Sequence, residues 1–282
     1  MRVFRVPLIV SHVVMALFLL SFLSACQGSS APTPSQGDPA ANEYETVRAR
    51  MRQQDEEVAE AYSAEHADDL PSTPEEVFAR HLEAVGGKEA FDAVDTMVLR
   101  FSVHSSVGEF AELVRYYKRP LHFRQEMSVS PRAVVSDGDR VWWVTEDEWE
   151  LPEDETGYLP LVSMDNHLID PGALGIVHEL VGVAAVDGEP GFLVRRTWPH
   201  GAEHDLFFSA SSGLLTGIRS ESPLTPESWF SYWDYRDVGG MRFPFVQIRS
   251  IGDAGPPHGL VLQTAELNVP LPDSLFFPPD ER

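Results

Sequence analysis

The spacing of apolar residues along the chain changes from a helical period to a strand period near residue 95. Residues 43–69 are highly charged and carry only a thin apolar stripe at helical spacing, which predicts a mostly solvated helix. A stronger helix is predicted over 74–85, where Ser72 or Thr73 can cap the first turn, four apolar residues share one face and a glycine pair ends it. A short helical turn over 88–94 is expected to lead into the first strand.

From residue 95 onward, apolar and polar residues alternate, which is the period of a β-strand with one buried face. Asp137-Gly138, Asp187-Gly188 and Gly239-Gly240 are typical hairpin turns between such runs. The stretch 146–175 breaks the pattern and is interpreted as an insertion or lid. The predicted strands are 95–104, 110–118, 121–129, 132–136, 140–145, 176–186, 190–198, 204–209, 214–221, 229–237, 242–252 and 259–268.

A single sheet of about a dozen strands would expose long edges unless it curves around another element. The amphipathic helix at 74–85 is the segment best suited to fill its concave side. We therefore predict a mainly β (α+β) fold, in which a strongly curved antiparallel sheet forms an incomplete barrel around one or more helices. An apolar cavity between the sheet and the helices is a further expectation.

The amino terminus has the layout of a secretory signal. Arg2 and Arg5 precede an apolar run over 6–23, and the run ends in Leu23-Ser24-Ala25-Cys26. This ending resembles the lipobox of bacterial lipoproteins, which implies cleavage before Cys26 and a diacylglycerol and acyl lipid on that cysteine. An ordinary signal peptide or an uncleaved anchor with an incidental cysteine is the alternative. Gln27, in place of an aspartate, favours the outer over the inner membrane.

These features predict four segments: a signal peptide (1–25), a lipidated flexible tether (26–42), an acidic helical arm (43–70) and the half-barrel domain (71–282). Removal of residues 1–25 takes away two arginines and no acidic residue, which leaves 19 basic against 44 acidic residues and a net charge of −25. Such a charge repels phosphate and excludes nucleic acid as a partner. A generally acidic surface, as in salt-adapted lineages, explains the charge without a function.

The candidates for chemistry are few. His200 and His204 would share a helix face and could bind zinc, but Pro199 and Gly201 favour a hairpin loop, where that spacing has no special meaning. No nucleophile motif and no phosphate-binding glycine loop occurs in the sequence. We therefore predict neither an enzyme nor a bound cofactor, and no metal site beyond these two weak candidates.

Large aromatic residues occupy both faces of several predicted strands. A half-exposed strand should show one polar face, so bulk on both faces suggests a second apolar surface. We predict that these residues line an apolar cavity, with contact to the insertion or to a partner protein as the alternative. The predicted lining is Trp142, Trp143, Phe207, Trp229, Tyr232 and Trp233.

Several turn and strand motifs resemble those of the LolA/LolB lipoprotein-carrier superfamily, and specifically its diverse lipoprotein members. They are Ala84-Val85-Gly86-Gly87, the Asp137-Gly138 strand with Val141-Trp142, the Val186-Asp187-Gly188 hairpin, Tyr235 to Pro244, and Pro272 to Phe276. The likeness covers about 72–280. It implies an incomplete barrel with a helical lid over a cavity that can hold acyl chains, while the long acidic segment before residue 72 departs from it.

Together these observations predict a periplasm-facing binding module of the bacterial envelope, joined to the membrane by its lipid anchor, that holds lipid or lipoprotein acyl chains. The alternative is a non-enzymatic scaffold lipoprotein whose sheet edge or acidic helix docks a protein that the sequence does not identify. A metal-dependent hydrolase built on His200 and His204 is a third hypothesis.

Overall fold

The computed structural model describes residues 39–106, 108–138, 140–145, 148–150, 175–199, 201–222, 225–251 and 257–277. Within these ranges, three α-helices precede the sheet: α2 (Pro39–Glu65), α3 (Pro74–Ala84) and α4 (Gly87–Asp92). Cys26 and most of the predicted insertion lie outside the described residues. No helix in the described ranges is long and apolar enough to span a membrane.

The thirteen strands in the described part of the chain form one antiparallel sheet, in the order β6-β5-β4-β3-β2-β1-β13-β12-β11-β10-β9-β8-β7. Sequence neighbours pair as hairpins, and β1 pairs with β13, which brings the first and last strands together in the middle. The strands are β1 (Thr96–Ser105), β2 (Gly108–Lys118), β3 (His122–Met127), β4 (Ala133–Asp137), β5 (Val141–Val144), β6 (Trp149–Glu150), β7 (Val177–Val186), β8 (Glu189–Thr197), β9 (Glu203–Ser209), β10 (Leu215–Ser222), β11 (Thr225–Val238), β12 (Met241–Ile251) and β13 (His258–Leu267).

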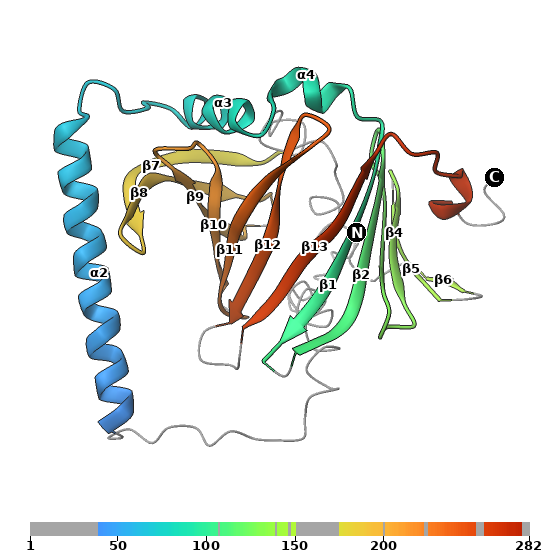
Figure 1. The fold of residues 1–282 in the computed structure, drawn as a ribbon, viewed down its shortest axis with the longest axis horizontal. Helices are drawn as coiled ribbons and strands as arrows, with labels where there is room; N and C mark the ends of the chain where they lie inside the picture. The colour runs from blue at the N-terminus through green and yellow to red at the C-terminus, as the bar shows by residue number, and fades with distance from the viewer. Residues whose placement is uncertain are drawn as a thin grey trace, which may run out of the picture.

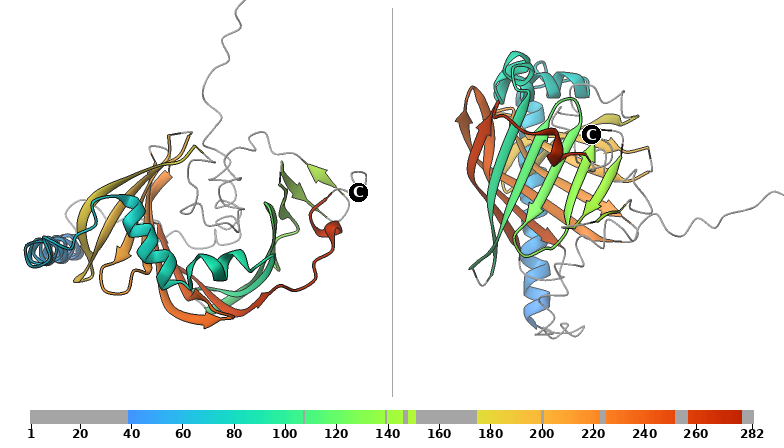
Figure 2. Two further views of the ribbon diagram at one scale, coloured as in Figure 1. Left: turned by 90° about the horizontal axis from the view of Figure 1, so that it is seen from above. Right: turned by 90° about the vertical axis from the view of Figure 1, so that its right-hand side faces the viewer.

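Seen from above, the sheet is an open arc whose two edge strands, β6 and β7, do not pair with each other (Figure 2, left). Helices α3 and α4 lie on its concave side and cross one end of the strands (Figure 1). The predicted fold class, a strongly curved antiparallel sheet wrapped around helices, is therefore confirmed. The sheet also contains a short strand, β6, inside the stretch that was expected to be an insertion.

The start of α3 follows the predicted capping pattern. The Thr73 hydroxyl accepts a hydrogen bond from the Glu76 amide at 3.4 Å, and the Glu76 carboxylate accepts one from the Ser72 amide at 2.6 Å. This reciprocal arrangement satisfies two amides that the first helical turn leaves without partners. Val77 and Phe78, both buried, then face the sheet, where they pack against Phe192 of β8 and Phe208 of β9.

Helix α2 begins at residue 39, inside the segment predicted to be a tether, and lies against β7 and β8 (Figure 1). Asp55, which interrupts its apolar stripe, has a structural role: its carboxylate accepts a hydrogen bond from the Gly188 amide at 2.8 Å. Tyr62 packs against the apolar cluster beneath α3. The helix is therefore attached to the domain at two levels.

Gly86, between α3 and α4, is expected to be among the least replaceable residues. Its φ of +122° is a conformation that side chains disfavour, and a β-carbon there would lie 2.2 Å from the Gly240 carbonyl oxygen. We expect Gly86→Ala to lower the free energy of unfolding by about 2 kcal/mol or more, because strain and steric overlap add. Urea unfolding measures this, and Gly87→Ala, where a β-carbon meets no atom within 4 Å, separates strain from overlap. Equal losses in the two variants would contradict the close contact.

Candidate ligand-binding site

Helices α3 and α4 cover part of the concave face of the sheet, and we call them the α3–α4 lid. A cavity of about 240 Å³ lies between this lid and the sheet. Its lid side is formed by His81, Val85, Phe91 and Val94, and Arg119 also lines it. The sheet side consists of Met97 on β1, Leu215 on β10, Tyr232 and Tyr235 on β11, and Met241, Arg242, Phe243 and Pro244 on β12. The cavity is slightly smaller than the roughly 300 Å³ at the lower end of ordinary ligand sites. It can therefore take part of an acyl chain, and a longer chain requires the lid to move.

Backbone and side-chain contacts hold the lid in place. The Arg242 amide donates to the Val85 carbonyl at 2.9 Å, and the Arg119 guanidinium donates to the carbonyls of Val94 and Phe91, both at 2.7 Å. His81 contacts the Gly213 carbonyl through Nδ1 at 3.1 Å. Burial lowers the pKa of His81 to about 4, so at neutral pH its ring is uncharged and Nδ1 is the protonated nitrogen that donates this bond.

The concave face beyond the cavity is mainly apolar where it meets the lid. Ala90 and Phe91 of α4 pack on a large cluster that includes Leu99, Phe101 and Leu113. Because burial of apolar surface contributes roughly 25 cal/mol per Å², this packing and that of α3 add a hydrophobic attraction to the hydrogen bonds between lid and sheet. An apolar ligand could replace this part of the attraction.

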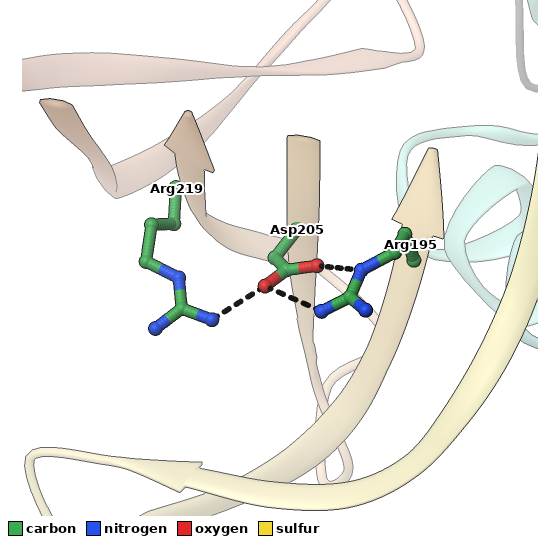
Figure 3. A network of polar contacts seen from close by, with 3 residues as sticks. All are labelled: Arg195, Asp205 and Arg219. Carbon is green, nitrogen blue, oxygen red and sulfur yellow. Dashed lines mark hydrogen bonds and ion pairs between the residues drawn. The ribbon is translucent and has the colours of Figure 1, made fainter. Parts of the chain in front are cut away.

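The convex face carries a wider hollow of about 530 Å³ over β2–β5, lined by Glu112, Arg124, Glu126 and other mostly polar groups. It is open to solvent and more polar than the cavity beneath the lid, so we regard the smaller cavity as the candidate site. The convex face also holds a buried ion network, in which Asp205 bonds Arg195 at 2.9 Å and Arg219 at 2.5 Å (Figure 3).

The structure separates the six aromatic residues predicted to line a cavity. Tyr232 lines the cavity, and Trp143 packs on the concave cluster beneath α4. The other four lie on the convex face. Trp142 packs with Val135 and Trp149, Phe207 packs against Trp229 with tilted rings whose centres are 4.9 Å apart, and Trp233 is 55% exposed.

Histidine placement does not assemble a metal centre in the described parts of the chain. His200 lies outside them, and His204 accepts a hydrogen bond from the Trp198 indole at Nδ1, 3.1 Å away. Among the described residues, no group of three or more histidine, cysteine, aspartate or glutamate side chains is arranged to hold a metal ion. The metal-dependent hydrolase hypothesis gains no geometric support from these residues.

Polar groups also occur on the concave face, below the cavity. Tyr232 connects the cavity with these polar groups. It lines the cavity, and the positive charges of Arg115 on β2 and Arg196 on β8 act on its hydroxyl. Burial raises the pKa of Tyr232 to about 12, although both arginine charges oppose the rise. Strand alternation is the one sequence signal that could have found these residues, since it places neighbouring Arg195 and Arg196 on opposite faces.

Comparison with known proteins places the fold. No family model matches the sequence, and no curated protein matches it. Among solved structures, a LolA superfamily protein from Nitrosomonas europaea is similar over 74% of this chain and 99% of its own, with 12% identity and a TM-score of 0.55. A DUF1329 family protein from Desulfovibrio piger is similar over 71% of this chain and 95% of its own, with 11% identity and a TM-score of 0.51.

These likenesses agree with the resemblance drawn from the turn motifs and extend it to the arrangement of the strands. At such low identity they establish architecture rather than activity. The chain therefore has the LolA-like fold, an open antiparallel half-barrel with helices on its concave side.

Proposed function

We propose that this protein is a lipid-anchored, periplasm-facing binding protein that holds acyl chains of lipids or lipoproteins beneath its α3–α4 lid. The observation that carries the proposal is the apolar cavity between the lid and β10–β12, enclosed by a LolA-like half-barrel. Such an arrangement suits a ligand recognised by buried methylene groups rather than by directed hydrogen bonds.

The location follows from the amino terminus. The signal-like segment and the Leu23-Ser24-Ala25-Cys26 ending support export and acylation of Cys26, and Gln27 supports the outer membrane. With two or three acyl chains, each methylene contributing about 0.8 kcal/mol, the anchor would be essentially permanent. Mass spectrometry of the membrane-extracted protein should show a chain that begins at Cys26 and carries diacylglycerol and acyl mass. A chain that retains residues 1–25 would contradict the lipobox.

Ligand binding is tested with fatty acids of increasing length in a fluorescence displacement assay. Affinity should rise by about fourfold for each added methylene, since each contributes about 0.8 kcal/mol, until the available space is filled. Leu215→Trp adds bulk to a half-buried cavity residue and should weaken binding by about tenfold or more.

Trp233→Leu is the matched control, because Trp233 is an exposed residue of the opposite face. It should leave affinity unchanged, and thermal unfolding of both variants shows whether each is folded. Affinity that does not depend on chain length, or equal effects of the two substitutions, would contradict acyl-chain binding in the cavity. It would favour the scaffold hypothesis.

A further inference from the structure

Arginines on the two faces of the sheet differ in their partners. On the convex face, Arg195 and Arg219 share the buried Asp205 carboxylate (Figure 3). On the same face, Arg124 contacts Glu126 at 2.6 Å. On the concave face, none of Arg115, Arg196 and Arg249 forms an ion pair with any carboxylate in the described ranges. In a protein with a net charge of −23, where acidic groups are abundant, this difference requires an explanation.

Arg196 is the most deeply buried of the three, with 5% of its surface exposed. Its guanidinium lies 5.3 Å from the centre of the Trp198 ring, and Nε donates to His178 Nε2 at 3.2 Å. Arginine has donors only, so Nε2 of His178 must be the acceptor. The proton of a neutral His178 ring is then on Nδ1, which is buried and has no partner among the described residues.

Among the described residues, the groups on this face that lack partners therefore include donors. Besides His178 Nδ1, the buried Nε of Arg249 lacks an acceptor in the described part of the chain, and no described residue bonds the terminal nitrogens of Arg196. Arg115 donates from Nε to the neutral Gln125 side chain at 2.9 Å and also hydrogen-bonds the Tyr117 side chain, so its partners carry no negative charge. Buried donors without acceptors each oppose folding, which is why native proteins contain few of them.

Their place in the sheet relates them to the cavity. Arg196 on β8 and Arg115 on β2 lie on the concave face on opposite sides of β11, and the positive charge of each acts on the Tyr232 hydroxyl. Burial lowers the pKa of Arg196 to about 10, which still leaves the guanidinium charged at neutral pH. Because Tyr232 also lines the cavity, one residue joins the apolar space under the lid to this cationic group.

We infer that Arg115, Arg196 and Tyr232, with His178 beside Arg196, form a binding site for the anionic headgroup of an amphiphile whose acyl chain lies in the cavity. The inference rests on the proposed function and adds the ligand class: a single-chain or two-chain lipid with a phosphate or carboxylate. Oxygen acceptors of such a group would satisfy the donors for which the described residues provide no acceptor, and would compensate the buried charge.

The acidic surface does not oppose this assignment. Exposed charges are screened over about 8–10 Å at ordinary ionic strength, whereas partly buried arginines act on a bound group at contact distance. An anionic headgroup would therefore be attracted locally. Bulky polyanions such as nucleic acids would still be repelled by the surface as a whole.

The test compares two ligands with the same chain, 1-lauroyl lysophosphatidic acid and 1-lauroyl glycerol, with inorganic phosphate as a third. The phospholipid should bind about tenfold or more tightly than the neutral lipid, as expected for charge-assisted hydrogen bonds. Arg196→Gln and Arg115→Gln should each remove most of that difference without changing affinity for 1-lauroyl glycerol. Arg115 is only half-buried, so Arg115→Gln remains informative if loss of Arg196 prevents folding.

Arg100→Gln is the matched control, because Arg100 lies on β1 with its side chain near Glu112 on the convex face and the substitution removes the same charge. It should retain the preference for the phospholipid. Equal affinity for both lauroyl ligands would overturn the headgroup site while leaving acyl-chain binding intact. Inorganic phosphate binding as tightly as the phospholipid would show that the chain contributes nothing, and no binding of either lipid would refute both proposals.

Discussion

Replacing Asp205 with alanine is expected to lower the free energy of unfolding by about 3 kcal/mol. The carboxylate is 7% exposed and holds two arginines from the adjacent strands β8 and β10, so its loss leaves two partly buried cations without a partner. Urea unfolding at pH 7 measures the change. Glu112→Ala is the comparison, since Glu112 faces Arg100 at 3.7 Å in an exposed pair that should contribute less than about 1 kcal/mol.

The same network predicts a response to acid. Burial acts to raise the pKa of Asp205, but the hydrogen bonds from Arg195 and Arg219 outweigh it and hold that pKa below its usual value. A depressed carboxylate pKa means that the stabilisation is fully present above about pH 4 and is lost as the pH falls further. If Asp205→Ala costs no more than Glu112→Ala, or shows the same loss below pH 4 as the wild type, the network is not a stabilising feature.

Lowering the pH from 7 to 5 is expected to destabilise the wild type by about 2 kcal/mol through His81 alone. Burial lowers the pKa of His81 from 6.5 to about 4 in the folded protein. The unfolded chain therefore takes up a proton between these values that the folded protein does not, and stability falls from pH 6.5 down to about 4. The lid is the part affected first, because His81 joins α3 to the Gly213 carbonyl.

The His81→Asn variant tests this origin. Asparagine can still donate a hydrogen bond toward Gly213 but does not titrate. The difference in the free energy of unfolding between pH 7 and pH 5 should therefore shrink by about 2 kcal/mol. His178, whose pKa burial and the charge of Arg196 also lower to about 4, contributes a separate part that remains in the variant. Identical pH dependence in wild type and variant would show that His81 is accessible to protons in the folded state.

The strands and the lid helices could be predicted from sequence because each depends on local spacing. Thr73, Glu76 and the glycine pair bound α3 through contacts within a few residues, and period-two alternation marks the long strands. Helix α2 was harder to predict, because one contact that attaches it to the domain is the hydrogen bond from the Gly188 amide to Asp55, and these residues are far apart in the sequence. The two-residue strand β6 is too short to show a period.

The site was only partly predictable. Alternation places Trp142 and Trp143 on opposite faces but does not say which face is concave, and apolar residues on both faces removed the usual signal. Bulges between Val103 and His104 and between Leu180 and Gly182 shift the register, so the face of one residue cannot be extrapolated along a whole strand. The cavity combines Phe91, Leu215 and Phe243, which are far apart in the sequence and come together through the folding of the lid helices onto a sheet in which β1 pairs with β13.

The central claim, that an acyl chain occupies the space under the lid, is tested most directly by native mass spectrometry with lipid extraction. The protein would be exported behind an ordinary cleavable signal in place of residues 1–26 and purified from a bacterial periplasm without detergent. The account predicts a co-purified fatty acid or phospholipid, which Leu215→Trp loses and Trp233→Leu retains. A mass without ligand, unchanged after incubation with lipids and acylated peptides, would contradict the claim and direct the search to a protein partner.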